Sequence, residues 1–166
     1  RGSMAVQGKI TIRDCELNNP LEFVIDKAAT INVYNTPHTK GSVLVLDNES
    51  YLNVFWPVGI SVVWQNDVPA IGTKLDLATM AGQAVFTGTT NENGTLPNML
   101  WVQEYMGHNM VLTKFTPHRI TCSKGRAVST DFFMIDRQLN ITFRLVDTVP
   151  PDLVVKYPFD GQRLNN

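Results

Sequence analysis

Residues 30–64 read TINVYNTPHTKGSVLVLDNESYLNVFWPVGISVVW, and this stretch decides the fold class. Polar and apolar residues alternate in TINVY and in YLNVFW, and both runs are rich in β-branched and aromatic side chains. Alternation with a period of two is typical of a strand that buries one face. Asp47-Asn48-Glu49 separates two of these runs, as the residues of a turn would. The stretch therefore predicts several short strands in succession.

The same pattern recurs along the rest of the chain, up to residues 153–157, at intervals of about 8–12 residues. We therefore expect an all-β protein, an antiparallel β-sandwich that is jelly-roll-like. Apolar residues in the range 75–84 have roughly helical spacing, so at most one short helix is expected there. The sequence shows no linker and no repeat at a fixed period, which predicts a single domain over residues 4–166.

The first residues look foreign to the domain. Arg1-Gly2-Ser3 precede Met4 and resemble the remnant of an expression vector, so we exclude residues 1–3 from the fold. The longest mostly apolar stretch, residues 55–64, is far shorter than the roughly 18 residues of a membrane-spanning helix. We therefore expect no insertion into a membrane.

The charge balance bears on possible partners. The chain has 14 Lys and Arg against 15 Asp and Glu, a formal net charge of −1. A nucleic-acid-binding protein needs a basic excess gathered on one face. We therefore expect no nucleic-acid partner. Charged residues make up 17% of the chain, below the roughly 25% of ordinary domains, which predicts wide uncharged surfaces.

Two cysteines, Cys15 and Cys122, are far apart in the sequence. No Cys-x-x-Cys spacing is present, so they do not indicate a zinc site. In an oxidising compartment the pair could form one disulfide that closes a long loop, and two buried free thiols are the alternative.

Catalytic signatures are missing from the sequence. No Gly-x-Ser-x-Gly occurs, and the carboxylates are scattered singly. His38, His108 and His118 share no ligand motif, so no metal site is expected. No glycine-rich loop opens a helix, so no nucleotide cofactor is expected either. The sequence leans away from an enzyme and indicates no cofactor.

A binding site is the remaining expectation, and the longest loop is where we place it. Residues 90–98 form a long polar loop just before Trp101. An aromatic ring beside amide groups suits a sugar, whose ring has an apolar face and hydroxyls at its rim. We therefore predict a ligand site made of Trp101, Asn91, Glu92, Asn93 and Asn98, with Trp101 in the core as the alternative.

Low charge, abundant Asn and Thr and many short strands resemble the composition of viral and phage surface modules and of bacterial adhesins. The first hypothesis is a receptor- or glycan-binding module of a virion, phage tail or bacterial surface organelle, with a glycan or host-cell receptor as partner. A structural assembly subunit (capsid, tail or pilus component) and a β-sandwich enzyme with a dispersed site are the alternatives. Exposed edge strands invite pairing, so we expect a homo-oligomer, with a trimer favoured, at a virion or extracellular surface.

Overall fold

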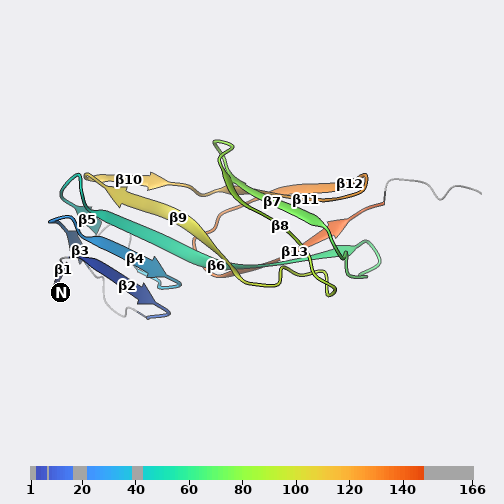
Figure 1. The fold of residues 1–166 in the computed structure, drawn as a ribbon, viewed down its shortest axis with the longest axis horizontal. Helices are drawn as coiled ribbons and strands as arrows, with labels where there is room; N and C mark the ends of the chain where they lie inside the picture. The colour runs from blue at the N-terminus through green and yellow to red at the C-terminus, as the bar shows by residue number, and fades with distance from the viewer. Residues whose placement is uncertain (1–2, 7, 17–21, 39–42, 148–166) are drawn as a thin grey trace, which may run out of the picture.

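Figure 1 shows an elongated molecule built of strands, in which one long strand runs from one half into the other. The computed structural model describes residues 3–6, 8–16, 22–38 and 43–147, and in these ranges there is no helix. The all-β prediction is confirmed. The strands, in chain order, are β1 (Ser3–Val6), β2 (Lys9–Arg13), β3 (Glu22–Ile25), β4 (Thr30–Tyr34), β5 (Val43–Val45), β6 (Tyr51–Trp64), β7 (Lys74–Thr79), β8 (Ala84–Thr89), β9 (Leu100–His108), β10 (Val111–Lys114), β11 (His118–Lys124), β12 (Ala127–Phe133) and β13 (Leu139–Leu145).

The helical candidate at residues 75–84 forms β7 and the turn that leads into β8. Leu75 and Leu77 are buried on one face of the sheet. Asp76 lies between them on the other face, where it accepts a hydrogen bond of 2.8 Å from the Thr87 hydroxyl. The alternation of these residues therefore outweighs their helical spacing. The strand predicted at residues 153–157 lies outside the described residues. Ser3, which the sequence analysis excludes from the fold, is the first residue of β1.

The first six strands form a short parallel solenoid, seen in Figure 1 as the half that carries β1 to β5. Strands β1, β3 and β5 pair in parallel in one sheet, while β2, β4 and the start of β6 pair in parallel in another. In the second sheet, Ile10 aligns with Ile31, and Ile31 aligns with Leu52. Side-chain hydrogen bonds between these coils join residues 21 positions apart. Neighbouring strands are therefore offset by 21 residues in this sheet, whereas the offsets in the β1-β3-β5 sheet are 19 and 20 residues. This half departs from the antiparallel pairing that the sequence predicted.

Side-chain hydrogen bonds follow the coil period. Asn53 Nδ2 donates to Asn32 Oδ1 at 3.0 Å, and Asn35 Nδ2 donates to Asp14 Oδ1 at 2.8 Å. The backbone N–H of Ala29 donates to the Ser50 hydroxyl at 3.1 Å, again across 21 residues. In the second sheet the coils therefore repeat every 21 residues, a structural repeat that the sequence analysis did not identify. The repeat preserves residue type rather than identity, which conceals it in a direct reading of the sequence.

Apolar side chains fill the inside of the solenoid. The side chains that point inward come from alternate positions of the strands and from one turn, and each is completely buried: Ile25, Ala29, Ile31, Val33, Leu52 and Val54. Burying a side chain of this size stabilises a fold by roughly 1.5–3 kcal/mol. Burial of these alternate apolar side chains therefore stabilises the stack of coils.

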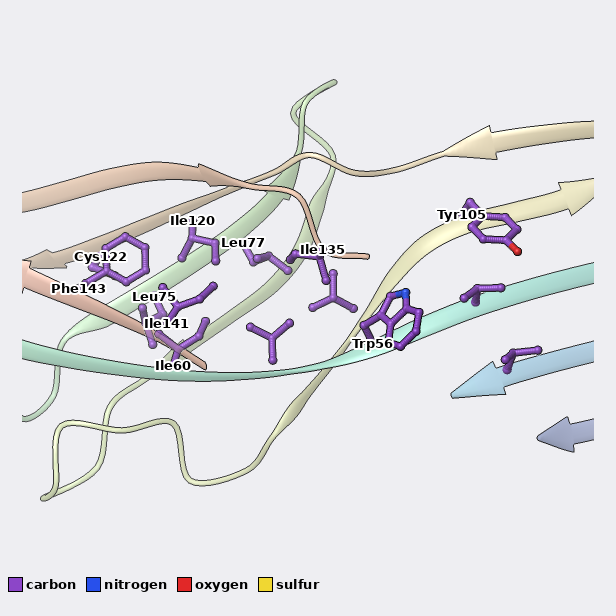
Figure 2. Packing of buried hydrophobic residues seen from close by; sticks show 14 of the residues in the cluster. Trp56, Ile60, Leu75, Leu77, Tyr105, Ile120, Cys122, Ile135, Ile141 and Phe143 are labelled. Carbon is purple, nitrogen blue, oxygen red and sulfur yellow. The ribbon is translucent and has the colours of Figure 1, made fainter. Parts of the chain in front are cut away.

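The other half is a sandwich of two layers. One layer is an antiparallel sheet in the order β12-β11-β7-β8, and the other consists of the second part of β6 with β13 paired parallel to it. Figure 2 shows apolar side chains from both layers meeting in the core, among them Ile60, Leu75, Leu77, Ile120, Ile141 and Phe143. The sandwich prediction is confirmed, and a jelly-roll arrangement of its strands is not.

Strand β6 belongs to both halves. Its first residues form the last coil of the solenoid, and its later residues form a layer of the sandwich. Strands β9 and β10 continue the solenoid sheet beyond β6 with antiparallel pairing. One hydrophobic cluster extends from Ile25 in the solenoid to Leu145 in the sandwich. The solenoid and the sandwich therefore share one hydrophobic core.

The two cysteines are free and belong to different halves. Cys15 follows β2 in the solenoid and is exposed, whereas Cys122 lies in β11 and is completely buried in the sandwich core. Burial raises the pKa of the Cys122 thiol to about 12. The disulfide considered for this pair is therefore not formed, and the core has enclosed one of its two thiols.

Candidate binding face

A row of rings lies on the outer face of the solenoid sheet. The register aligns Arg13 of β2 with Tyr34 of β4 and Phe55 of β6, and Trp101 of β9 lies opposite Pro57. These side chains point outward because their neighbours in sequence fill the solenoid core. The rings of Tyr34 and Phe55 stack at 4.8 Å, and Trp101 meets Tyr34 edge-on at 5.2 Å.

Arg13 completes this row with a positive charge. Its guanidinium carbon lies 4.7 Å from the centre of the Tyr34 ring and 4.9 Å from that of Trp101. Contact with two ring faces holds a guanidinium by cation–π attraction while its N–H groups keep their hydrogen-bonding capacity. Arg13 makes no ion pair with any residue that the structure describes. The face therefore presents a positioned cation.

A row of amides runs beside the rings. Gln103 Nε2 donates to Asn53 Oδ1 at 3.0 Å, and Asn53 donates in turn to Asn32. All three side chains are half-buried, and they come from the neighbouring strands β9, β6 and β4. Hydrogen bonding within the row fixes the orientation of each amide. We call the two rows together, made of Arg13, Asn32, Tyr34, Asn53, Phe55, Trp101 and Gln103, the aromatic–amide face.

The structure separates Trp101 from most of the predicted loop site. The loop lies along β6, where Val62 N donates to Gly94 O at 2.7 Å and Leu96 N donates to Ile60 O at 3.0 Å. Trp101 lies opposite Pro57, five residues from Val62, which corresponds to about 16 Å along a strand. Trp101 therefore joins the aromatic–amide face and not the turn formed by residues 91–94.

Within the loop, the predicted residues have different roles. Asn91 Oδ1 accepts hydrogen bonds from Asn93 N at 3.0 Å and from both Thr95 N and Thr95 Oγ1 at 3.1 Å and 3.0 Å. The Asn91 side chain therefore closes the turn, while Glu92 and Asn93 are exposed at its tip. Asn98 lines a shallow hollow of ≈330 Å³ between the loop and the outer side of β6 and β13.

Buried polar residues lie at the junction of the two halves, where the sequence predicts no site. Glu104 is the extra residue of a bulge in β9, where Tyr105 aligns with Val54 and Gln103 with Phe55. The bulge turns two consecutive side chains inward, so Glu104 and Tyr105 are both buried. Burial, with the charge of Glu104 as a second cause, raises the pKa of Tyr105. In the sequence, the only signal of this bulge is a charged residue, Glu104, within a strand whose side chains otherwise alternate between the two faces of the sheet.

The three histidines lie apart. His38 Nε2 contacts the Tyr105 hydroxyl, and the His108 ring stacks on Tyr51 at 4.3 Å. His118 is buried beside a hollow of ≈240 Å³, and neither ring nitrogen has a hydrogen-bond partner in the described part of the chain. Desolvation lowers the pKa of His118. No group of three or more His, Cys, Asp or Glu residues that could hold a metal occurs among the described residues.

The comparisons with known proteins give no family. No protein-family model matches the chain, and no curated protein matches it. Among the described residues, no helix is long and apolar enough to cross a membrane. The aromatic–amide face is therefore the feature from which a function can be inferred.

Proposed function

We propose that this protein is a non-enzymatic receptor- or glycan-binding module that acts through the aromatic–amide face. A virion, phage tail or bacterial surface organelle is the setting we propose for it. One observation carries the proposal: the half-buried rings of Tyr34 and Trp101 lie beside a row of hydrogen-bonded amides on the same sheet. Binding sites of this kind combine an apolar platform with a few oriented polar groups.

The chemistry of the face matches that of a sugar chain. The apolar face of a pyranose packs on an aromatic ring, and its hydroxyls exchange hydrogen bonds with amides that both donate and accept. Arg13 adds donors suited to a carboxylate, because a guanidinium pairs with a carboxylate through two parallel hydrogen bonds. The favoured ligand is therefore a glycan that contains acidic sugars.

The enzyme alternative has weaker support. Glycoside hydrolysis needs two carboxyl groups on either side of the bond that is cleaved. The buried carboxylate of Glu104 accepts a hydrogen bond from Trp56 Nε1 at 2.6 Å inside the core, away from the outer face. Asp14 on the outer face accepts a hydrogen bond from Asn35 and thereby stabilises the coil.

A glycan array that includes neutral and uronic-acid-containing chains tests the proposal. We expect saturable binding that Trp101→Ala and Tyr34→Ala each weaken at least tenfold, because each variant removes part of the platform. Arg13→Gln should weaken binding of acidic glycans more than of neutral ones. All three variants should keep the circular dichroism of the parent.

Trp64→Ala is the matched control, because Trp64 is also half-buried and has Lys124 over its ring at 6.0 Å. It lines a separate hollow of ≈290 Å³ with Gln65, Asn66, Val68 and Asp147. Loss of binding in Trp64→Ala with retention in Trp101→Ala would move the site to that hollow. Loss in Asn98→Ala alone would instead restore the loop site predicted from the sequence.

Self-association is a second candidate function, favoured by an exposed apolar patch at the β9–β10 turn. Met110 is 74% exposed and Val111 is 60% exposed, and Leu46 and Leu112 are also exposed. The Met110 N–H donates to Val45 O at 2.7 Å, which brings Leu46 next to this turn. A trimer remains our expectation. A light-scattering mass near 18.6 kDa at tens of micromolar would contradict it, and Val111→Asp should dissociate a trimer that forms through this patch.

A further inference from the structure

The solenoid has an open end, formed by the outer edges of β1 and β2. Each of these strands is the last in its sheet, and among the described residues no strand pairs with its outer edge. Edge strands present a row of backbone N–H and C=O groups that can template another strand. Figure 1 shows the two edges at the same side of the molecule, near the N-terminus.

Burial decreases toward this end. Ile31 and Val33 of the second coil are completely buried, as are Leu52 and Val54 of the third. In the first coil the equivalent residues, Ile10 and Ile12, are only half-buried although they point into the same core. The apolar stack that holds the coils together is therefore uncovered at the open end.

The edge strands of both sheets, β1 and β2, lie at the same end of the solenoid, and this restricts what can cover them. A single added strand would pair with one sheet and leave the other edge open. A segment that covers both must offer two strands joined by a short turn, as each coil of the solenoid does. Parallel pairing in register also keeps inward side chains over inward side chains, whereas a shift by one residue would reverse them.

We propose that this open end is an interaction surface whose occupant is a parallel coil of two strands joined by a short turn, with apolar residues over Ile10 and Ile12. The inference rests on continuity with the coil-on-coil interface already present between β2, β4 and β6. The surface that would be covered is the edge of the sheets, so the aromatic–amide face stays accessible.

A tandem duplication tests the proposal. A second copy of the sequence of residues 3–21 is placed before Ser3, which repeats the offset that the register gives between Ser3 of β1 and Glu22 of β3. In the added copy, Lys9→Thr, Arg13→Thr and Asp14→Asn prevent like charges from stacking. The matched control carries Ile10→Asn and Ile12→Asn in the added copy. A second version has six Gly and Ser residues between the copy and Ser3.

Amide hydrogen exchange of the original Lys9–Arg13 strand is the readout. We expect protection of this strand to rise at least tenfold in the duplicated chain, with a higher melting temperature, and not to rise in the control. If the strand gains no protection in the duplicated chain, either with or without the six Gly and Ser residues, the proposal is wrong. A dimer of the unmodified chain that protects the same amides would also overturn it, because a second copy would then be the occupant.

Discussion

The indole of Trp56 and the carboxylate of Glu104 face each other at the junction of the solenoid and the sandwich, where Trp56 Nε1 donates to Glu104 Oε2 at 2.6 Å. Both side chains are buried, with 4% and 2% of their surfaces exposed. Figure 2 shows Trp56 between Tyr105 and the apolar residues of the sandwich core. The bulge in β9 turns Glu104 inward, and its carboxylate there accepts the hydrogen bond of the buried indole N–H, which is thereby satisfied.

Removing the acceptor should destabilise the protein. We expect Glu104→Leu to lower the free energy of unfolding by about 1–3 kcal/mol, because the buried indole N–H loses its partner. Glu104→Gln keeps an acceptor and should cost less. Urea denaturation followed by tryptophan fluorescence measures both, with the exposed Glu92→Gln as control. Equal losses in the Leu and Gln variants would show that the hydrogen bond to Trp56 is not what matters.

His118 should make stability depend on pH. Burial lowers its pKa in the folded state, so on acidification the unfolded chain takes up a proton before the folded one does. The contribution of His118 to stability is therefore fully present above the unfolded pKa of about 6.5 and is lost as pH falls toward the folded pKa. Melting temperatures between pH 7.5 and 5 should fall less in His118→Leu than in the parent. Parallel curves for His118→Leu and the parent would contradict this.

The two thiols should differ in reactivity. Cys15 is exposed, whereas burial encloses Cys122 and raises its pKa to about 12. Since the thiolate is the reactive form, we expect Ellman's reagent at pH 8 to modify one thiol in the native protein and two in guanidinium. Cys15→Ser should leave no reactive thiol in the native state. Rapid modification of two thiols without denaturant would show that the sandwich core opens.

Gly94 should be intolerant of a side chain. Its φ is +70°, and a Cβ atom there would lie 2.5 Å from Val62 O. We expect Gly94→Ala to destabilise the protein by more than the roughly 1–2 kcal/mol that a left-handed backbone alone costs. Gly125→Ala is the control, because Gly125 has a φ of +59° and no atom within 4 Å of the added Cβ. Equal losses in the two variants, measured by urea denaturation, would mean that the loop moves away from β6 easily.

Alternation along the chain was sufficient to predict strands, because each strand buries one face whatever its partners are. The direction of pairing depends on connections, and a solenoid coil with a short apolar strand on each side looks like a hairpin in the sequence. The repeat was missed for the same reason, since Ile10, Ile31 and Leu52 share only their apolar character. Hydrogen bonds such as that from Asn53 to Asn32 become evident only once the register is known.

The site predicted from the sequence and the aromatic–amide face share Trp101, which is half-buried. Its partners could not be predicted, because Arg13 and Tyr34 reach it through strand pairing across the sheet rather than through nearness in sequence. The loop residues were chosen for their polarity, yet Asn91 uses its polarity to close a turn.

Strand β6 also has a mechanical consequence. Its 14 residues span about 45 Å without interruption and belong to both halves. A pull applied along β6 at its first residue, Tyr51, would pass along one covalent backbone into the sandwich. The hydrogen bonds that tie β6 to its antiparallel neighbour β9 lie across the strand, so such a pull would load them in shear, all at once. The junction should therefore resist bending and should not behave as a hinge.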